Sequence, residues 1–483
     1  MRILIVLFAL AVLSLPVWAS ERPNIVYVLA DDFGYGDSGC YNTRCQIPTP
    51  NIDRLAREGI RFTDAHSGSA VCSPTLYGIL TGRYAWRTRL RRGVLGPYDP
   101  PLISADRLTV PAFLKKQGYQ TACVGKWHLG WDWPSQDGKV VFDRLIAGGP
   151  TARGFDCYFG TDVPNYPPYC FIENERTVGQ PTAEKTTRDL NGRPWPMLPG
   201  WKFDAILPAL SQKAVAFIAD QARARKPFFL YFPLTSPHEP IAPSARFKGK
   251  SGISDLADFM METDWALGEV LSALKKHGVE NDTLIFFTAD NGHAPYTGLP
   301  ALRKAGHSVS GPLRGFKADL WEGGHRVPFL VRWPGKVKAG SICSEPICHT
   351  NLLATCAEVL GASPPSAAGE DSFSILPLLQ GGQPERPTHE AVVHQAANGE
   401  LAIRQGNWKL LFLAEQKAKD GKVALYELAT DLGETKDVHA DQADVVKRLT
   451  SLMEKYIVEG RSTPGPRQQN DVTVRLHQPS LKK

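Results

Sequence analysis

The sequence predicts an α/β protein with a large doubly wound sheet, mixed but mostly parallel and flanked by helices. A small C-terminal antiparallel sheet with one helix is expected to follow it. Apolar runs of strand length alternate with helix-length segments over the first three quarters of the chain, as in βαβ units. The last quarter instead holds short strands separated by turns. The 483 residues, 43% of them hydrophobic, suffice for one large and one smaller core.

The strands of the large sheet are predicted from apolar runs rich in β-branched and aromatic residues. Continuous apolar strands are typical of parallel sheets that are covered on both faces. The runs are residues 23–30, 119–124, 228–232, 283–288 and 327–332. Helices are expected at residues 50–56, 109–116, 206–224, 254–277 and 350–360. Residues 131–201 are rich in Pro, Gly and aromatic residues, and we expect a loop-dominated insertion that shapes a substrate pocket.

A change of pattern predicts the domain boundaries. Pro364-Pro365 and Gly381-Gly382 mark a linker. Short strands are expected beyond it, with one helix at residues 443–458; the strands are residues 391–393, 401–403, 408–412 and 424–428. The resulting expectation is a signal peptide over residues 1–19, an α/β domain over 20–365, an α+β subdomain over 385–460 and a flexible tail over 461–483.

The N-terminus is predicted to be a secretory signal peptide. Arg2 supplies the positive start, residues 3–17 are apolar, and small residues predict cleavage after Ala19. The alternative is an uncleaved anchor, although the apolar run is short for a membrane span. No later apolar run is long enough to span a bilayer, so we expect a secreted or periplasmic protein without a stable membrane anchor.

Charge and cysteine content narrow the class of protein. The formal net charge is +6, and several of the cations lie in the tail after residue 460, so the body is nearly neutral. We therefore expect no nucleic-acid partner. Nine cysteines in an exported chain suggest disulfides, with Cys40/Cys45 and Cys157/Cys170 near enough in sequence to pair locally. The connectivity stays open, because setting Cys72 aside leaves eight cysteines and about 105 pairings.

Polar and charged side chains follow the predicted strands of the large sheet. They are Asp31, Asp32, Lys126, His128, His238, Asp290 and Asn291. Ligands of doubly wound sheets bind beyond the carboxyl ends of the strands, so these residues are expected to converge. The carboxylate and amide oxygens suit Ca²⁺ or Mg²⁺. His293 and His307 are candidates for the substrate pocket or for packing.

A loop-to-helix junction at residues 72–83 carries the most specific pattern, CSPTLYGILTGR. Its proline suits the first turn of a helix, and its cysteine lies where unpaired backbone N–H groups favour an anion. The stretch resembles the signature of the type I sulfatases, C-x-P-S-R followed by L-T-G-R, within the alkaline-phosphatase-like superfamily. Cys72, Pro74 and the closing LTGR match, Thr75 stands for serine, and Leu76 stands for the arginine of the signature.

The resemblance extends over about residues 24–460. Lys317, in LRGFK, matches the family's second active-site lysine, and EGGHRVP follows it as in the family. The segments RxGxWK and LYEL, with Asp431 and Glu434, resemble the sulfatase C-terminal subdomain.

In the type I sulfatases the signature cysteine is oxidised to formylglycine (3-oxoalanine), whose hydrated gem-diol attacks sulfur. The resemblance therefore implies an exported sulfuric-ester hydrolase acting on a sulfated carbohydrate or an aryl or alkyl sulfate. It implies a maturation partner, a formylglycine-generating enzyme or an anaerobic sulfatase-maturating enzyme. The implied cofactor is one divalent ion, calcium rather than magnesium, held by Asp31, Asp32, Cys72, Asp290 and Asn291.

By position, the resemblance implies five catalytic residues: Cys72, Lys126, His128, His238 and Lys317. His238, with Lys317, helps the alcohol to leave, and His128 removes the proton that releases sulfate. Lys126 holds the aldehyde hydrate and the sulfate. Arg83 is expected to tie down the helix.

Leu76 removes a cation from the implied active site, one helical turn beyond Cys72. Arg83, Arg87 and Arg314 are candidates to replace it. Two other functions stay open: a related phosphodiesterase or phosphonate hydrolase, and a non-catalytic pseudo-sulfatase that binds sulfated glycans.

Overall fold

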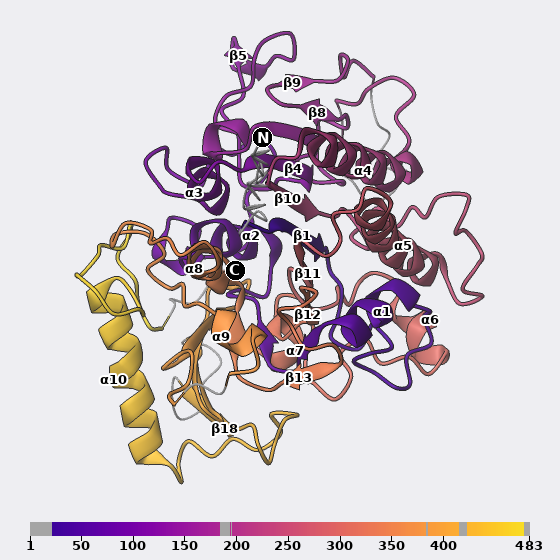
Figure 1. Cartoon of the computed structure of the whole chain (residues 1–483). Helices are drawn as coiled ribbons and strands as arrows, with labels where there is room; N and C mark the ends of the chain where they lie inside the picture. The colour runs from indigo at the N-terminus through magenta and orange to yellow at the C-terminus, as the bar shows by residue number, and fades with distance from the viewer. Residues whose placement is uncertain (1–21, 184–193, 195, 383–384, 415–422, 478–483) are drawn as a thin grey trace, which may run out of the picture.

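The computed structural model describes residues 22–183, 194, 196–382, 385–414 and 423–477 (Figure 1). The predicted signal peptide and its cleavage site at Ala19 lie outside these residues. Within the described part of the chain, no helix is both long and apolar enough to cross a bilayer.

A ten-stranded mixed sheet forms the centre of the molecule. Its order is β13 (Ser341–Cys343), β2 (Ile60–Phe62), β12 (Phe329–Arg332), β11 (Thr283–Ala289), β1 (Asn24–Ala30), β10 (Phe228–Pro233), β4 (Gln120–Lys126), β7 (Cys157–Thr161), β8 (Ile172–Glu173) and β9 (Arg176–Thr177). The five strands from β11 to β7 are mutually parallel, whereas β12, β8 and β9 introduce antiparallel pairs. The predicted fold class is confirmed.

Helices cover both faces of the sheet, because alternate residues of each strand point to opposite sides. In β1, Ile25, Tyr27 and Leu29 join one core, and Val26 and Val28 join the other. The first core packs against α2 (Cys72–Thr81), α3 (Val110–Lys116) and α8 (Leu352–Val359). The second packs against α1 (Pro50–Glu58), α4 (Ile206–Ala224), α5 (Asp255–Lys276) and α6 (Leu299–Lys304) (Figure 1).

The C-terminal part is a four-stranded antiparallel sheet with one helix, as predicted. Its strands are β15 (Val392–Gln395), β16 (Leu401–Gln405), β17 (Trp408–Phe412) and β18 (Val423–Glu427), in that order. Helix α10 (Ala443–Glu459) packs on β16 and β17. The short helices α7 (Glu322–His325) and α9 (Leu376–Leu379) precede this sheet, and β3 (Ala65–His66) pairs with β14 (Ile347–Cys348).

Two sequence-based expectations differ from the structure. The predicted insertion at residues 131–201 carries β7, a strand of the central sheet, besides the short hairpin of β5 (Ser135–Gln136) and β6 (Lys139–Val140). The expectation of disulfides is wrong, because all nine cysteines lie in the described part of the chain and are free. Cys123, Cys170, Cys348 and Cys356 are instead buried, as small apolar side chains are.

The segment after residue 460, for which the sequence predicts a flexible tail, contacts the large domain as far as it is described. Asp471 accepts hydrogen bonds from Arg83, and Asn470 accepts one from Arg87. Arg461 donates to the carbonyl of Ser366. These contacts join the tail to residues that follow α2.

Candidate active site

The carboxyl ends of β1 and β11 bring three acidic side chains together. The strands pair in parallel register, Ala30 opposite Ala289, so the next residues leave the sheet side by side. The N–H of Asp290 donates to the Ala30 carbonyl at 3.0 Å, and the N–H of Asp32 donates to Asp290 Oδ1 at 3.0 Å. Asp31, Asp32 and Asp290 are all at most 2% exposed. Buried carboxylates at this density need cations close by.

Two buried lysines supply part of that charge. Lys126 Nζ lies 2.9 and 2.8 Å from the two carboxylate oxygens of Asp31. Lys317 Nζ lies 2.5 Å from Asp32 Oδ1, which also accepts a hydrogen bond from Asn291 Nδ2 at 2.8 Å. Burial opposes ionisation of Asp31, but Lys126 and its neighbours outweigh burial and lower its pKa. Lys126 therefore favours the charged form of Asp31.

Three further oxygens at this point have no hydrogen-bond partner among the described residues. Asp32 Oδ2, Asp290 Oδ2 and Asn291 Oδ1 are buried and accept no hydrogen bond from any described residue. Burial, and then the charge of Asp31, raises the pKa of Asp290 to about 8. Unpaired buried oxygens next to like charges are a good fit for a hard divalent cation such as Ca²⁺ or Mg²⁺. Ligand atoms of Asp31, Asp32, Cys72 and His238 also lie within 4.8 Å of one another.

Cys72 begins helix α2 and faces the same cluster. Its Sγ lies 3.7 Å from Asp31 Oδ1, and the residue is 2% exposed. Burial raises the pKa of the thiol well above its ordinary value, although Lys126 and Lys317 oppose the shift. An unmodified Cys72 is thus a protonated thiol at neutral pH and a poor nucleophile, since the thiolate is the reactive form.

The two predicted histidines each leave one ring nitrogen available. His238 lies at the other end of the cluster, with Nε2 3.9 Å from Asp32 Oδ2. Its Nδ1 faces the Glu239 carbonyl at 2.6 Å; a carbonyl can only accept, so Nδ1 carries the proton in the neutral ring. His128 donates in the same way from Nε2 to the Leu95 carbonyl at 3.0 Å, which leaves its buried Nδ1 unprotonated and unpartnered. Burial lowers the pKa of both histidines.

Asp162 positions His128, and the sequence analysis did not find it. Asp162 Oδ1 accepts hydrogen bonds from the His128 N–H at 3.1 Å and from Trp131 Nε1 at 3.0 Å. These bonds fix a backbone that is left-handed at His128, with φ 48°. Asp162 follows β7, the strand inside the predicted insertion, so no local pattern marked it.

Comparisons with known proteins identify the family of the chain. The family model for sulfatases matches residues 23–362. The chain belongs to the sulfatase family.

An N-acetylgalactosamine-6-O-sulfatase of Bacteroides thetaiotaomicron is 32% identical to this sulfatase, covering 90% of this chain and 93% of the relative. Human arylsulfatase A is 32% identical to this sulfatase, and the match covers 93% of this chain and 90% of the relative. A solved B. thetaiotaomicron structure from work on the metabolism of multiple glycosaminoglycans has a TM-score of 0.80 at 31% identity, covering 90% of this chain and 99% of its own. A structure in complex with a neocarrahexaose has a TM-score of 0.72 at 26% identity, and the match covers 90% of this chain and 92% of that chain. The predicted family and enzyme class, sulfuric ester hydrolase, are confirmed.

This sulfatase lacks the signature arginine, and a buried leucine stands in its place. Leu76 is 1% exposed and belongs to the apolar core that contains Cys72. Arg83 is held by Glu370 at 3.1 Å, besides Tyr77 and the tail. It therefore ties down the end of α2, as predicted, and does not reach the site.

The other two arginines that the sequence offered as substitutes are also bound elsewhere. Arg87 is paired with Asp371 at 2.8 Å, and Arg314 donates to the Glu434 carbonyl. The ion-pair and hydrogen-bond partners of all three suggested arginines thus lie outside the acidic cluster.

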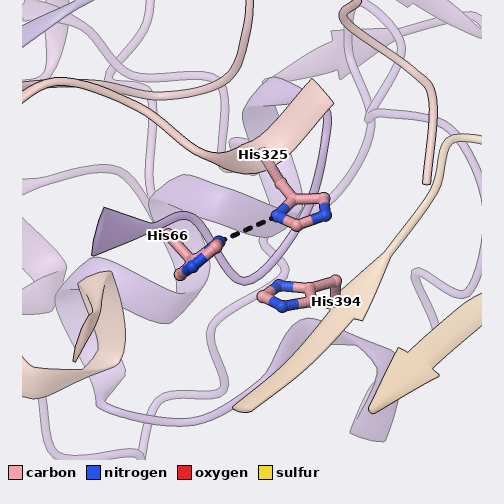
Figure 2. Close-up of side chains that lie close together, drawn as sticks. All are labelled: His66, His325 and His394. Carbon is pink, nitrogen blue, oxygen red and sulfur yellow. Dashed lines mark hydrogen bonds between the residues drawn. The ribbon is translucent and has the colours of Figure 1, made fainter. Parts of the chain in front are cut away.

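A second cluster of metal-ligating residue types does not fit a metal. Ligand atoms of His66, His325 and His394 lie within 4.8 Å of one another (Figure 2). The rings of His325 and His394, however, stack at 3.8 Å with 13° between their planes. An imidazole binds a metal in its ring plane, so two stacked rings cannot direct their nitrogens at one ion. Arg404, 3.0 Å from His66, also adds positive charge where a cation would sit.

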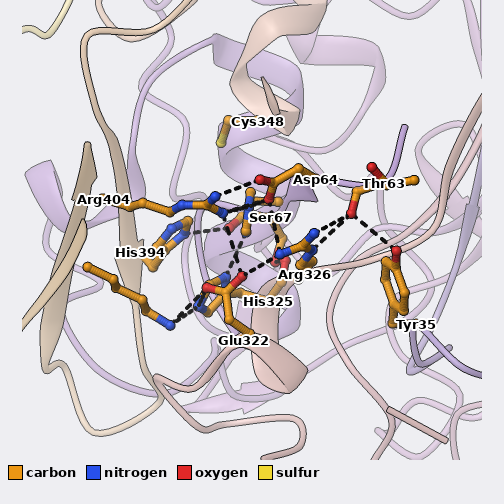
Figure 3. Close-up of polar contacts among 12 residues, drawn as sticks. Tyr35, Thr63, Asp64, Ser67, Glu322, His325, Arg326, Cys348, His394 and Arg404 are labelled. Carbon is orange, nitrogen blue, oxygen red and sulfur yellow. Dashed lines mark hydrogen bonds and ion pairs between the residues drawn. The ribbon is translucent and has the colours of Figure 1, made fainter. Parts of the chain in front are cut away.

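The surroundings of these histidines form a buried, charge-balanced ion cluster between the two domains (Figure 3). Lys409 Nζ lies 3.0 Å from Glu322 and 2.7 Å from Glu434. The guanidinium of Arg404 binds Asp64 at 2.6 Å. Three carboxylates face three cations, which are Asp64, Glu322, Glu434, Arg326, Arg404 and Lys409. The cluster joins α7 and the β3 region to the small sheet.

Proposed function

We propose that the protein is an exported sulfatase that removes sulfate from a sulfated carbohydrate, with formylglycine formed from Cys72 and one bound calcium ion. One observation carries the proposal: Cys72 lies beside two buried lysines and three unpaired oxygens. As a thiol in this position, Cys72 has a raised pKa and is unsuited to attack.

Asp31, Asp32, Asp290, Asn291 and the modified side chain of Cys72 would hold the ion, whose charge would stabilise the oxygens of the transferring sulfuryl group. Hydrated formylglycine would supply the attacking hydroxyl. Magnesium is the weaker alternative, because it demands stricter octahedral geometry than a mixed set of carboxylate and amide oxygens provides.

The lysines and histidines supply charge and proton transfer. Lys126 and Lys317 lie on either side of the acidic cluster and neutralise negative charge on the sulfate. His238 Nε2 has its lone pair free in the neutral ring, and a bound sulfate anion favours the protonated form that donates to the leaving alcohol. The free Nδ1 of His128 suits the acceptor role in sulfate release.

A sulfated sugar is the substrate class that the relatives favour. One relative is named as a sulfatase of N-acetylgalactosamine, and one solved structure is a complex with a neocarrahexaose, which is an oligosaccharide. We propose sulfated hexosamines as the first substrates to test. Small aryl or alkyl sulfate esters are the alternative substrates.

Export and maturation complete the proposal. The N-terminal signal and cleavage near Ala19 imply a secreted or periplasmic enzyme, with residues 20–365 as catalytic domain and 385–460 as C-terminal subdomain. A formylglycine-generating or anaerobic sulfatase-maturating enzyme would act on Cys72 before or during folding, since the folded protein buries this side chain.

The test measures hydrolysis by protein co-expressed with a maturation enzyme, followed as inorganic sulfate released from the sulfate esters and as phenol released from the aryl esters. Sulfated N-acetylgalactosamine, an aryl sulfate, an aryl phosphate and an aryl phosphonate are compared, with Cys72→Ala as the inactive control. We expect sulfate release from the sugar that is lost in the control. Preferential turnover of phosphate or phosphonate would overturn the proposal in favour of the related hydrolase; a phosphonate monoester hydrolase shares this fold at 19% identity and a TM-score of 0.60. Binding of the sugar without turnover would favour a pseudo-sulfatase.

A further inference from the structure

The backbone of Leu95 joins the start of helix α2 to the ring of His128. The Leu95 N–H donates to Ser73 Oγ at 3.1 Å, and the Leu95 carbonyl accepts from His128 Nε2 at 3.0 Å. Ser73 is the residue after Cys72, in the first turn of α2. Ser73, Leu95 and His128 are all at most 3% exposed. One buried residue therefore connects the helix that carries Cys72 with the histidine that follows β4.

The Leu95 carbonyl selects the ring nitrogen of His128 that carries the proton. A carbonyl oxygen only accepts, so this hydrogen bond keeps the proton on Nε2 and leaves a free lone pair on Nδ1. Nδ1 is buried and has no hydrogen-bond partner among the described residues. In the other tautomer Nδ1 would carry the proton and could not accept one. The place of this carbonyl thus decides whether His128 presents a proton acceptor.

The other contacts of His128 do not select a ring nitrogen. Asp162 Oδ1 accepts from the backbone N–H of His128 at 3.1 Å, so it fixes the main chain. The ring of Tyr166 lies edge-on to the imidazole, with 5.5 Å between the ring centroids and 82° between their planes. An aromatic edge contact limits the tilt of the imidazole but accepts no proton from it. The tautomer of His128 therefore depends on Leu95.

The loop of residues 90–95 is also anchored to the C-terminal sheet. Gln395, the last residue of β15, donates from Nε2 to the Leu90 carbonyl at 3.2 Å. The Gly93 N–H donates to the Ala397 carbonyl at 2.7 Å. Gln395 is 1% exposed, and a buried hydrogen bond of this kind is costly to break because it leaves its partner unpaired. The loop is thus fixed by α2 through Ser73 and by the small sheet through Gln395.

We propose that Ser73 is a positioning residue for His128, acting through Leu95, and that Gln395 is the second anchor of the same loop. The inference rests on the proposed sulfatase function, in which His128 accepts the proton that releases sulfate. It gives a role to the variable position of the C-x-P signature. It also gives the C-terminal sheet a part in catalysis, because this sheet helps to hold the loop that orients His128.

The first test observes the tautomer of His128 directly, on protein in which Cys72 is unmodified. Nitrogen-15 spectra of histidine-labelled protein distinguish protonated from unprotonated ring nitrogens, and His128→Asn identifies the signals of His128 by their loss. We expect the Nε2–H tautomer in wild type and in Ser73→Thr, which keeps the hydroxyl, and a mixture of tautomers in Ser73→Ala. Gln395→Met removes the other anchor and should shift the mixture in the same direction, which provides a second variant if Ser73→Ala does not fold.

Thr355→Val is the matched control for a merely structural effect. Thr355 lies in α8, is 1% exposed, and its Oγ1 accepts from the Ile375 N–H at 3.1 Å, the same kind of bond that Ser73 makes to Leu95. Its loss should lower stability and leave the tautomer of His128 unchanged. An Nε2–H tautomer that persists in both Ser73→Ala and Gln395→Met would overturn the inference.

The second test compares kcat with kcat/KM in matured protein. Rates are divided by the fraction of formylglycine at Cys72, since Ser73 adjoins the modified residue. Ser73→Ala should lower kcat about tenfold or more and change kcat/KM by less than about twofold, because His128 acts after the attack on sulfur. Ser73→Thr and Thr355→Val should retain kcat. Equal losses of kcat and kcat/KM in Ser73→Ala would overturn the positioning role. A matured wild type that releases no sulfate would refute the sulfatase proposal instead, and the tautomer would still be measured.

Discussion

Asp290→Asn tests the metal site through stability, without an activity measurement. In the protein without a cation, Asp32 Oδ2, Asp290 Oδ2 and Asn291 Oδ1 are buried without partners. A bound calcium ion would satisfy all three, and at 100 times its dissociation constant it would stabilise the fold by about 2.7 kcal/mol. For a chain of this size, that stabilisation corresponds to a rise in melting temperature of roughly 3 °C.

The asparagine keeps one ligand oxygen but removes a negative charge from the site. Calcium affinity should fall, so at the same calcium concentration the shift should drop below about 1 °C. Asp264→Asn is the matched control: Asp264 is buried and accepts hydrogen bonds from the start of α1, away from the site. It should lower the melting temperature and keep the calcium shift. Differential scanning calorimetry with EDTA and with calcium gives both values. A calcium shift of equal size in wild type and Asp290→Asn would refute the assignment.

Three further predictions concern stability and rate. Burial raises the pKa of Asp162 from 3.8 to about 6, so the free energy of unfolding is highest below pH 3.8 and falls by about 3 kcal/mol as the pH rises through 6. Asp162→Asn should remove this fall. A pH profile of urea unfolding that is the same in wild type and variant would contradict the reasoning. Lys409→Met leaves the buried carboxylates of Glu322 and Glu434 without their shared cation and should lower the free energy of unfolding by about 3–5 kcal/mol. Adding Glu434→Gln should restore part of this loss, measured by urea unfolding. Leu76→Arg should raise kcat/KM for a sulfate ester about tenfold or more, because it returns a cation near Cys72; a fall would mean that the pocket is adapted to leucine.

The convergence of the candidate site could be predicted from the sequence because it follows from local pattern and topology. Parallel strands place their carboxyl ends at one edge, so Asp31 and Asp290 had to meet once β1 and β11 were recognised. The strand ends also marked Lys126, His128 and His238, and the resemblance to the type I sulfatases added Lys317. The structure brings both lysines and His238 around the same acids and leaves one ring nitrogen of His128 free.

The remaining features depend on contacts between distant residues. Asp162 supports His128 across 34 positions, from a strand hidden in a Pro- and Gly-rich stretch. The sequence marked Lys409 and Glu434 as motif residues, but their pairing with each other and Glu322 exists only when the two domains pack. Composition suggested disulfides, whereas packing buries most of the thiols as apolar groups.

The most direct test of the central claim is mass spectrometry of the tryptic peptide 62–83 from protein isolated from its native host, measured on material with known sulfatase activity. This peptide ends at Arg61 and Arg83 cleavage sites and contains Cys72 as its only cysteine. We predict a peptide mass in which an aldehyde oxygen replaces the thiol of Cys72. The fraction of the peptide with this mass should rise in proportion to the specific activity of the preparation. Full sulfatase activity from protein whose peptide carries only an unmodified thiol would contradict the account.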